Sequence, residues 1–135
     1  MREATRFSLA SHSGEYATWP LKTTLLADLK PTATQISGYL IERQYQIGAR
    51  YLIITSWDCP FEEANDFVLL DENLAVIAHK HLGLPYGTFL LADISIVDAH
   101  TLRLRYLDND YWTLTIRDKA PLGLFTSHLS LQRDR

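Results

Sequence analysis

Apolar residues recur at every second position in two short runs near the end of the chain, residues 102–106 and 112–116. An alternation of period two is typical of a β-strand with one dry face and one wet face. Asp108, Asn109 and Asp110 separate the two runs, and so short a connection forces neighbouring strands to run antiparallel. The pattern therefore predicts an antiparallel meander, with Arg103, Arg105 and Arg117 on its wet face.

Earlier segments extend this meander back to Tyr39. Residues 39–47 alternate in the same way, and residues 51–57 are β-branched or aromatic and apolar on both faces, as in a central strand. Residues 67–70 and 74–78 predict a second hairpin around Asp71, Glu72 and Asn73, and residues 90–97 predict a further strand.

The ends of the chain show weaker patterns. Within residues 1–37 we expect a strand at 6–10 and a short helix at 21–30 that ends before Pro31. Part of the tail, residues 118–135, should pack against the meander at 39–117. The predicted fold is one mainly β domain, possibly α+β. Its single antiparallel sheet of about six strands either curls like a barrel or packs on the N-terminal segment.

Length and charge exclude several classes of protein. The 135 residues suit one domain, and the net charge of −3 argues against a general phosphate-backbone binder. Cys59 is the sole cysteine, so an internal disulfide is impossible. The first residues lack the apolar run of a signal peptide, and no stretch approaches the length of a membrane span. We expect a cytoplasmic protein that binds neither nucleic acid nor membrane.

The most unusual stretch combines aromatic and acidic residues. Six carboxylates and no basic residue lie between positions 58 and 72. Exposed aromatic residues among charges of one sign resemble an interface anchor combined with electrostatic steering. A surface of this kind predicts binding of a basic protein through Trp57, Asp58, Phe61, Glu62, Glu63, Asp66, Asp71 and Glu72. The alternative is that the aromatic residues face the core and the acids are simply solvated.

Candidates for catalysis or metal binding are isolated. Acidic neighbours of Cys59 disfavour the thiolate that a nucleophile needs. His79 and His81 share a face of any strand, but zinc needs at least a third ligand. The carboxylates near Asp58 match no defined acid–base pair, and the glycines form no phosphate-binding loop. We therefore expect no catalytic residue, no metal and no cofactor.

The run from Tyr39 to Arg117, with its acidic, aromatic segment, resembles small bacterial β-rich proteins of the toxin–immunity kind. That resemblance implies an inhibitor that binds a partner toxin, often a basic nuclease, and blocks its active site or a substrate-binding surface. The expected function is thus a cytoplasmic, non-enzymatic protein-binding module. Two alternatives remain open: a small-ligand-binding protein or enzyme with a site inside a curled sheet, and a structural subunit of a homo-oligomer.

Overall fold

A computed structural model of the chain describes residues 1–57, 64–83, 90–118 and 128–134. Strands make up 66% of the described residues and helices 5%. The N-terminal part contains β1 (Arg2–Glu3), β2 (Phe7–Leu9), the short 3₁₀ helix η1 (Tyr16–Thr18), β3 (Lys22–Ala27) and β4 (Lys30–Ser37). The middle contains β5 (Leu40–Ile47), β6 (Arg50–Ser56), β7 (Ala64–Leu70) and β8 (Val76–Gly83). The last part contains β9 (Leu91–Asp98), β10 (Thr101–Tyr106), η2 (Leu107–Asn109), β11 (Asp110–Ile116) and β12 (Leu129–Arg133).

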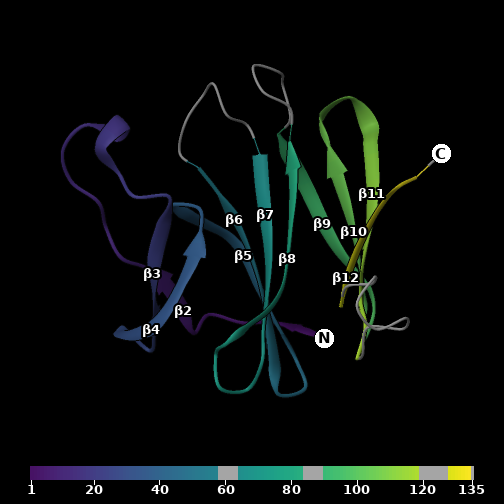
Figure 1. The fold of residues 1–135 in the computed structure, drawn as a ribbon. Helices are drawn as coiled ribbons and strands as arrows, with labels where there is room; N and C mark the ends of the chain where they lie inside the picture. The colour runs from purple at the N-terminus through teal and green to yellow at the C-terminus, as the bar shows by residue number, and fades with distance from the viewer. Residues whose placement is uncertain (58–63, 84–89, 119–127, 135) are drawn as a thin grey trace.

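The strands form three antiparallel sheets, which lie side by side in Figure 1. The central sheet has the order β1-β5-β6-β7-β8, and one outer sheet has the order β12-β11-β10-β9. The second outer sheet, β2-β3-β4, covers the opposite face of the central sheet. The chain is therefore a three-layered β structure, and the predictions of a single meander sheet and of a barrel-like closure are wrong.

Two hydrophobic cores fill the spaces between the layers, because successive residues of a strand point to opposite faces. Leu52 and Ile54 of β6 point toward the sheet β9–β12, whereas Ile53 between them points toward β2–β4. All three side chains have an exposed fraction of 0%. The unbroken apolar runs in β6 and β7 are thus explained by a sheet that is covered on both faces.

The N-terminal segment differs most from its prediction. Residues 22–27, expected within a helix, form β3, while the strand expected at residues 6–10 is present as β2. Gln44 of β5 holds β2 in place, since its side chain bonds both the backbone N–H and the backbone C=O of Phe7, each at 2.9 Å. The segment does pack on the central sheet, as one alternative proposed, but it does so as a third β-sheet.

A β-bulge in β5 changes which face of the sheet the alternating residues point to, so they do not all share the one face that the sequence predicts. The register with β6 shifts between Ile41 and Arg43, and such a shift moves the later side chains to the other face. Ile41 consequently packs in the core beside β2–β4, whereas Tyr45 and Ile47 pack in the core beside β9–β12. The remaining hairpins lie where the sequence predicts them, and the tail contributes β12, which pairs with β11.

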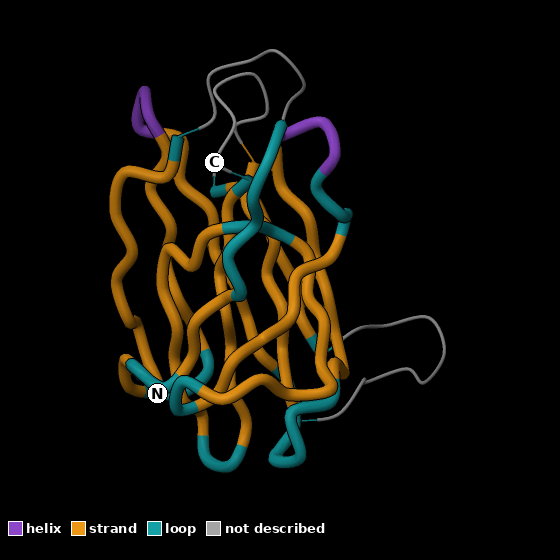
Figure 2. Tube along the Cα trace, turned by 90° about the vertical axis from the view of Figure 1, so that its left-hand side faces the viewer, coloured by secondary structure: helices purple, strands orange, loops and turns teal. Residues whose placement is uncertain are grey.

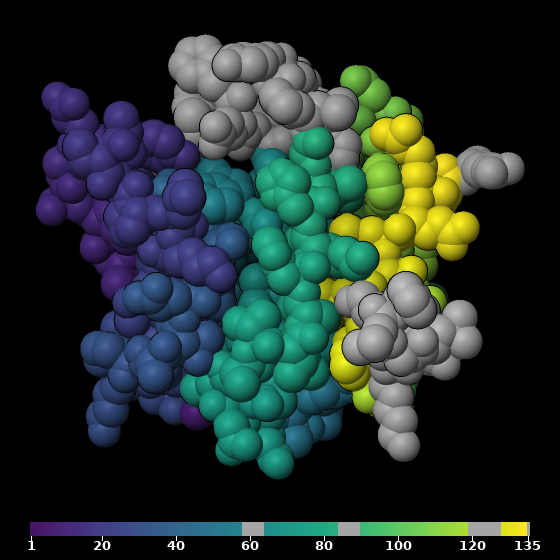
Figure 3. Space-filling model, in the orientation of Figure 1, coloured from purple at the N-terminus to yellow at the C-terminus, as the bar shows by residue number. Residues whose placement is uncertain are grey.

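Figure 2 shows both short helices at one end of the strands, with several tight turns at the other end. The space-filling view places β8 between the outer sheets on the surface that faces the viewer (Figure 3). None of the described helices is long and apolar enough to cross a lipid bilayer.

Candidate binding site at one end of the central sheet

Asp66 of β7 is a buried acid with three nitrogen neighbours. The pairing of the strands places it opposite Thr55 of β6 and His81 of β8. Period-two alternation then directs its side chain to the face that carries Val68 and Leu70, toward the sheet β2–β4.

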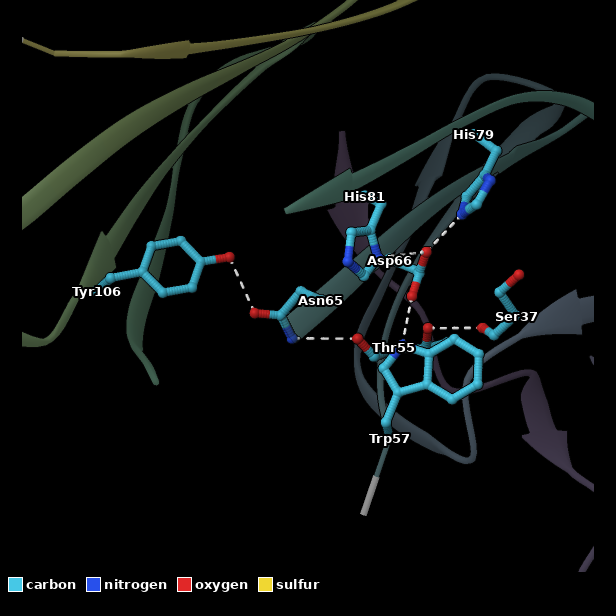
Figure 4. A network of polar contacts seen from close by, with 8 residues as sticks. All are labelled: Ser37, Thr55, Trp57, Asn65, Asp66, His79, His81 and Tyr106. Carbon is cyan, nitrogen blue, oxygen red and sulfur yellow. Dashed lines mark hydrogen bonds and ion pairs between the residues drawn. The ribbon is translucent and has the colours of Figure 1, made fainter. Parts of the chain in front are cut away.

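The Asp66 carboxylate, with a side chain only 2% exposed, accepts hydrogen bonds on both oxygens. Trp57 Nε1 donates to Oδ2 at 2.6 Å, while His79 Nε2 lies 2.6 Å and His81 Nδ1 lies 3.1 Å from Oδ1 (Figure 4). A buried charge without such partners would be costly. These contacts therefore compensate the burial of Asp66 and fix the orientation of three ring systems around it.

The two imidazoles extend from this buried acid into solvent. Their side chains are 43% exposed for His79 and 54% exposed for His81. An ionised carboxylate can only accept, so each ring donates an N–H to Asp66 from its nearer nitrogen. The second nitrogen of each ring is left for a hydrogen bond with a ligand.

Asn65, the residue before Asp66, connects the opposite face of β7 to the outer sheet. Its Nδ2 donates to the Thr55 carbonyl at 3.1 Å, and its Oδ1 accepts from the Tyr106 hydroxyl at 2.9 Å (Figure 4). Burial raises the pKa of Tyr106 above its ordinary value, and the nearby Asp110 adds to this effect. Tyr106 thus keeps the proton that it donates across the layers.

Trp57 also belongs to an aromatic cluster, which we define as His12, Tyr16, Trp19, Tyr39 and Trp57. The ring centroids of Tyr39 and Trp57 are 5.1 Å apart and nearly perpendicular, and the Tyr16 hydroxyl donates to the Trp57 carbonyl at 2.8 Å. Edge-to-face contacts of this kind favour packing beyond simple burial. The aromatic cluster thus fixes Trp57, which directly follows the last residue of β6, beside the η1 helix.

Gly38 allows the β4–β5 connection to pass close to this region. Its φ is 109°, and a Cβ atom there would overlap the Thr55 hydroxyl. That hydroxyl donates to the Ser37 carbonyl at 2.7 Å, and the Thr23 hydroxyl donates to the Gly38 carbonyl at 2.7 Å. Buried threonines thus hold the outer sheet β2–β4 against the strand that precedes Trp57.

The structure brings together only part of the predicted binding set. Trp57 and Asp66 are in direct contact, whereas Asp71 and Glu72 lie in the turn at the opposite end of β7. Asp71 stabilises that turn, because its Oδ1 accepts from the backbone N–H groups of Asn73 and Ala75. Asp58, Phe61, Glu62 and Glu63 lie outside the described residues, as does Cys59.

Sequence reasoning missed the link between Asp66 and the histidines. It grouped Asp66 with surface acids and considered His79 and His81 only as an incomplete metal site, whereas the acid is buried and both histidines contact it. Within the described ranges, no three His, Cys, Asp or Glu side chains are arranged to hold a metal ion. In comparisons of the chain with protein-family models, curated proteins and solved structures, nothing matches.

Proposed function

We propose that the chain is a non-enzymatic protein-binding module, most concretely an immunity-type inhibitor that binds a basic toxin through the segment between Trp57 and Asp66. One observation supports this proposal above the others: both strand ends that flank residues 58–63 are fixed by buried polar side chains. Trp57 is held by Asp66 and Tyr16, while Asn65 is held by Thr55 and Tyr106.

Fixed ends matter for binding because ordering a segment on association costs conformational entropy. A segment whose two ends are already positioned loses less freedom when it binds a partner. The segment also carries Asp58, Glu62 and Glu63 without a basic residue, and such charge steers a basic partner during the diffusional encounter. In this proposal Trp57 and Asp66 position the segment rather than contact the partner.

Asp71 and Glu72 belong to a different surface in this proposal. Four residues separate Asp66 from Asp71 along the chain, which is about 16 Å for extended backbone. Glu72 is exposed at that far end. It therefore provides a matched control for charge changes in the proposed binding segment.

The test is affinity capture from a lysate of the native organism with the wild-type chain and three single variants: Glu62→Lys, Glu63→Lys and Glu72→Lys. We expect the wild type and Glu72→Lys to retain the same basic protein at about 0.1 M salt and to release it at about 0.5 M. The captured protein is then purified for stopped-flow kinetics. Glu62→Lys and Glu63→Lys should lower its association rate about tenfold, because they remove steering charge.

Two results would count against this function. One is that no protein is retained specifically by the wild-type chain. The other is that Glu62→Lys and Glu63→Lys associate as fast as Glu72→Lys, with unchanged thermal midpoints throughout.

The arrangement of Asp66, His79 and His81 favours one second candidate, proton transfer to or from a bound small molecule. A buried carboxylate that orients a half-exposed imidazole is a recurring feature of general acid–base sites. A screen of activated esters and phosphoesters, with His79→Ala and His81→Ala as controls, tests this candidate. Turnover that is lost in either control supports it, and turnover that is equal in all three proteins rejects it.

A further inference from the structure

Leu29 occupies an unusual position at the tip of the β3–β4 hairpin. Its side chain is 83% exposed, and the two central turn residues, Asp28 and Leu29, have positive φ values of 52° and 66°. Turns with this backbone favour Asn-Gly, since an L-residue with a larger side chain is strained there. The chain thus holds a large apolar side chain in water, in a backbone conformation that disfavours it.

Charged residues flank this leucine on both sides. Asp28 pairs with Arg6 at 3.1 Å and remains 70% exposed, and Lys30, the first residue of β4, is exposed. We define residues 28–30 as the leucine tip. It presents one apolar side chain between a negative and a positive charge.

A pocket of about 440 Å³ lies between two other turns of the molecule. Its apolar lining comes from Met1, Ile47, Ala49 and Ala99, and its charged lining comes from Arg50, His100 and Asp118. Arg50 Nη2 donates to Asp118 Oδ1 at 2.8 Å, and His100 Nε2 lies 3.6 Å from the same oxygen. The pocket therefore combines apolar side chains with charged groups of both signs.

We propose that the leucine tip of one copy of the chain inserts into this pocket of a second copy. Leu29 would cover the apolar part of the lining, Asp28 would approach His100, which is 48% exposed, and Lys30 would approach Asp118, which is 78% exposed. The volume of the pocket exceeds that of a leucine side chain, and Lys30 and Asp118 are opposite in charge. Because the tip and the pocket are different surfaces, the contact is heterologous and can repeat from copy to copy.

The contact is small compared with the interfaces of stable dimers, so it forms a weak and concentration-dependent assembly. It also leaves the candidate binding site free. The pocket is lined by the β5–β6 turn, and the leucine tip is the β3–β4 turn; both turns lie at the same end of the strands (Figure 1). Trp57 follows the last residue of β6, at the opposite end of that strand. Failure of this proposal and failure of the proposed function are therefore independent.

Sedimentation velocity over a range of concentrations up to about 1 mM, where contacts with a millimolar Kd are detectable, tests the proposal. Leu29→Ser should remove the association seen for the wild type. Leu21→Ser is the matched control, because Leu21 is also 80% exposed but is not in the tip. Leu29→Gly should remove association as well, while its thermal midpoint stays equal or rises, since glycine accepts positive φ.

A mixing experiment tests the pairing of the two surfaces directly. Ala49→Glu blocks the pocket and Leu29→Gly removes the tip, so neither variant should associate alone. Their equimolar mixture should form dimers and no larger species, because one variant keeps its tip and the other keeps its pocket. A monomeric wild type at the highest concentration, equal effects of the two serine variants, or a mixture that stays monomeric would overturn the proposal.

Discussion

At the scale of single residues, Asp66 is the position whose environment differs most from the one that the sequence predicts. It follows Glu62 and Glu63 in a segment rich in acids, and the composition of that segment predicts a charged surface. In the structure it is 1% exposed and bonded to an indole and two imidazoles. The residue type alone does not reveal this, because its partners come from positions 57, 79 and 81.

Removing the Asp66 carboxylate should be costly. In Asp66→Ala the Trp57 N–H and both imidazoles lose a charged acceptor, and we expect the free energy of unfolding to fall by about 3 kcal/mol. Asp66→Asn keeps one acceptor oxygen and should cost about half as much. Urea denaturation of both variants, with the exposed Glu72→Gln as control, measures the effect. Equal stability of Asp66→Ala and Glu72→Gln would show that the cluster contributes nothing.

At the scale of elements, the hairpins are predictable and their registers are not. The turn around residues 71–73 was correctly located, but the β7–β8 register shifts between Leu69 and Leu70, and the left-handed residue of the turn is Leu74. A simple three-residue turn would pair Leu70 with Leu74, whereas Leu70 pairs with Val76. A register that pairs Leu70 with Leu74 would place Ala78 opposite Asp66, so it does not predict the observed pairing of Asp66 with His81.

The mistaken helix at residues 21–30 has a related cause. Thr23, Leu25 and Ala27 are the buried residues of β3, and the polar threonine breaks the apolar alternation that would identify a strand. The following turn consists of Asp28 and Leu29, and leucine is not a turn signal. Burial against the central sheet therefore decided the structure where local preference did not.

Gly38 is the element-level position most sensitive to substitution. An added Cβ atom would lie 2.5 Å from Thr55 Cβ, at a φ that disfavours any side chain. Gly38→Ala should therefore lower the free energy of unfolding by about 3 kcal/mol. Gly48→Ala is the control, since Gly48 also has positive φ but nothing lies within 4 Å of its added Cβ; it should cost about 1 kcal/mol. Thermal or urea unfolding distinguishes the two, and equal losses would rule out the steric part of this explanation.

At the scale of the whole molecule, the class of the fold is predictable and the layering is not. The alternating and doubly buried strands predict an antiparallel, mainly β protein, which the structure confirms. The unbroken apolar run of β6 also indicates that both faces of this strand are covered by other parts of the chain. What closes the second face is the N-terminal sheet, in which the sequence predicts β2 but neither β3 nor β4.

The interface between the central sheet and the sheet β9–β12 should weaken in alkali. Burial, aided by the nearby Glu3, raises the pKa of Tyr45 to about 12, against about 10 for an exposed tyrosine. Between these values the unfolded chain has lost a proton that the folded chain retains, so stability falls as the pH rises, by about 2.7 kcal/mol in all. Denaturant melts from pH 8 to pH 11 should show a shallower decline for Tyr45→Phe than for the wild type. Parallel declines would indicate that Tyr45 titrates normally.

The central sheet serves two cores at once, and this affects how the chain could be divided. A fragment that ended at Gly83 would lose β9–β12 and expose Leu52, Ile54, Phe67 and Leu69 to water. A fragment that began at Leu40 would lose β2–β4 and expose the opposite face, with Ile53, Val68 and Leu70. Neither fragment could keep both faces of the central sheet covered, so the two outer sheets, which come from opposite ends of the chain, depend on each other through the sheet between them.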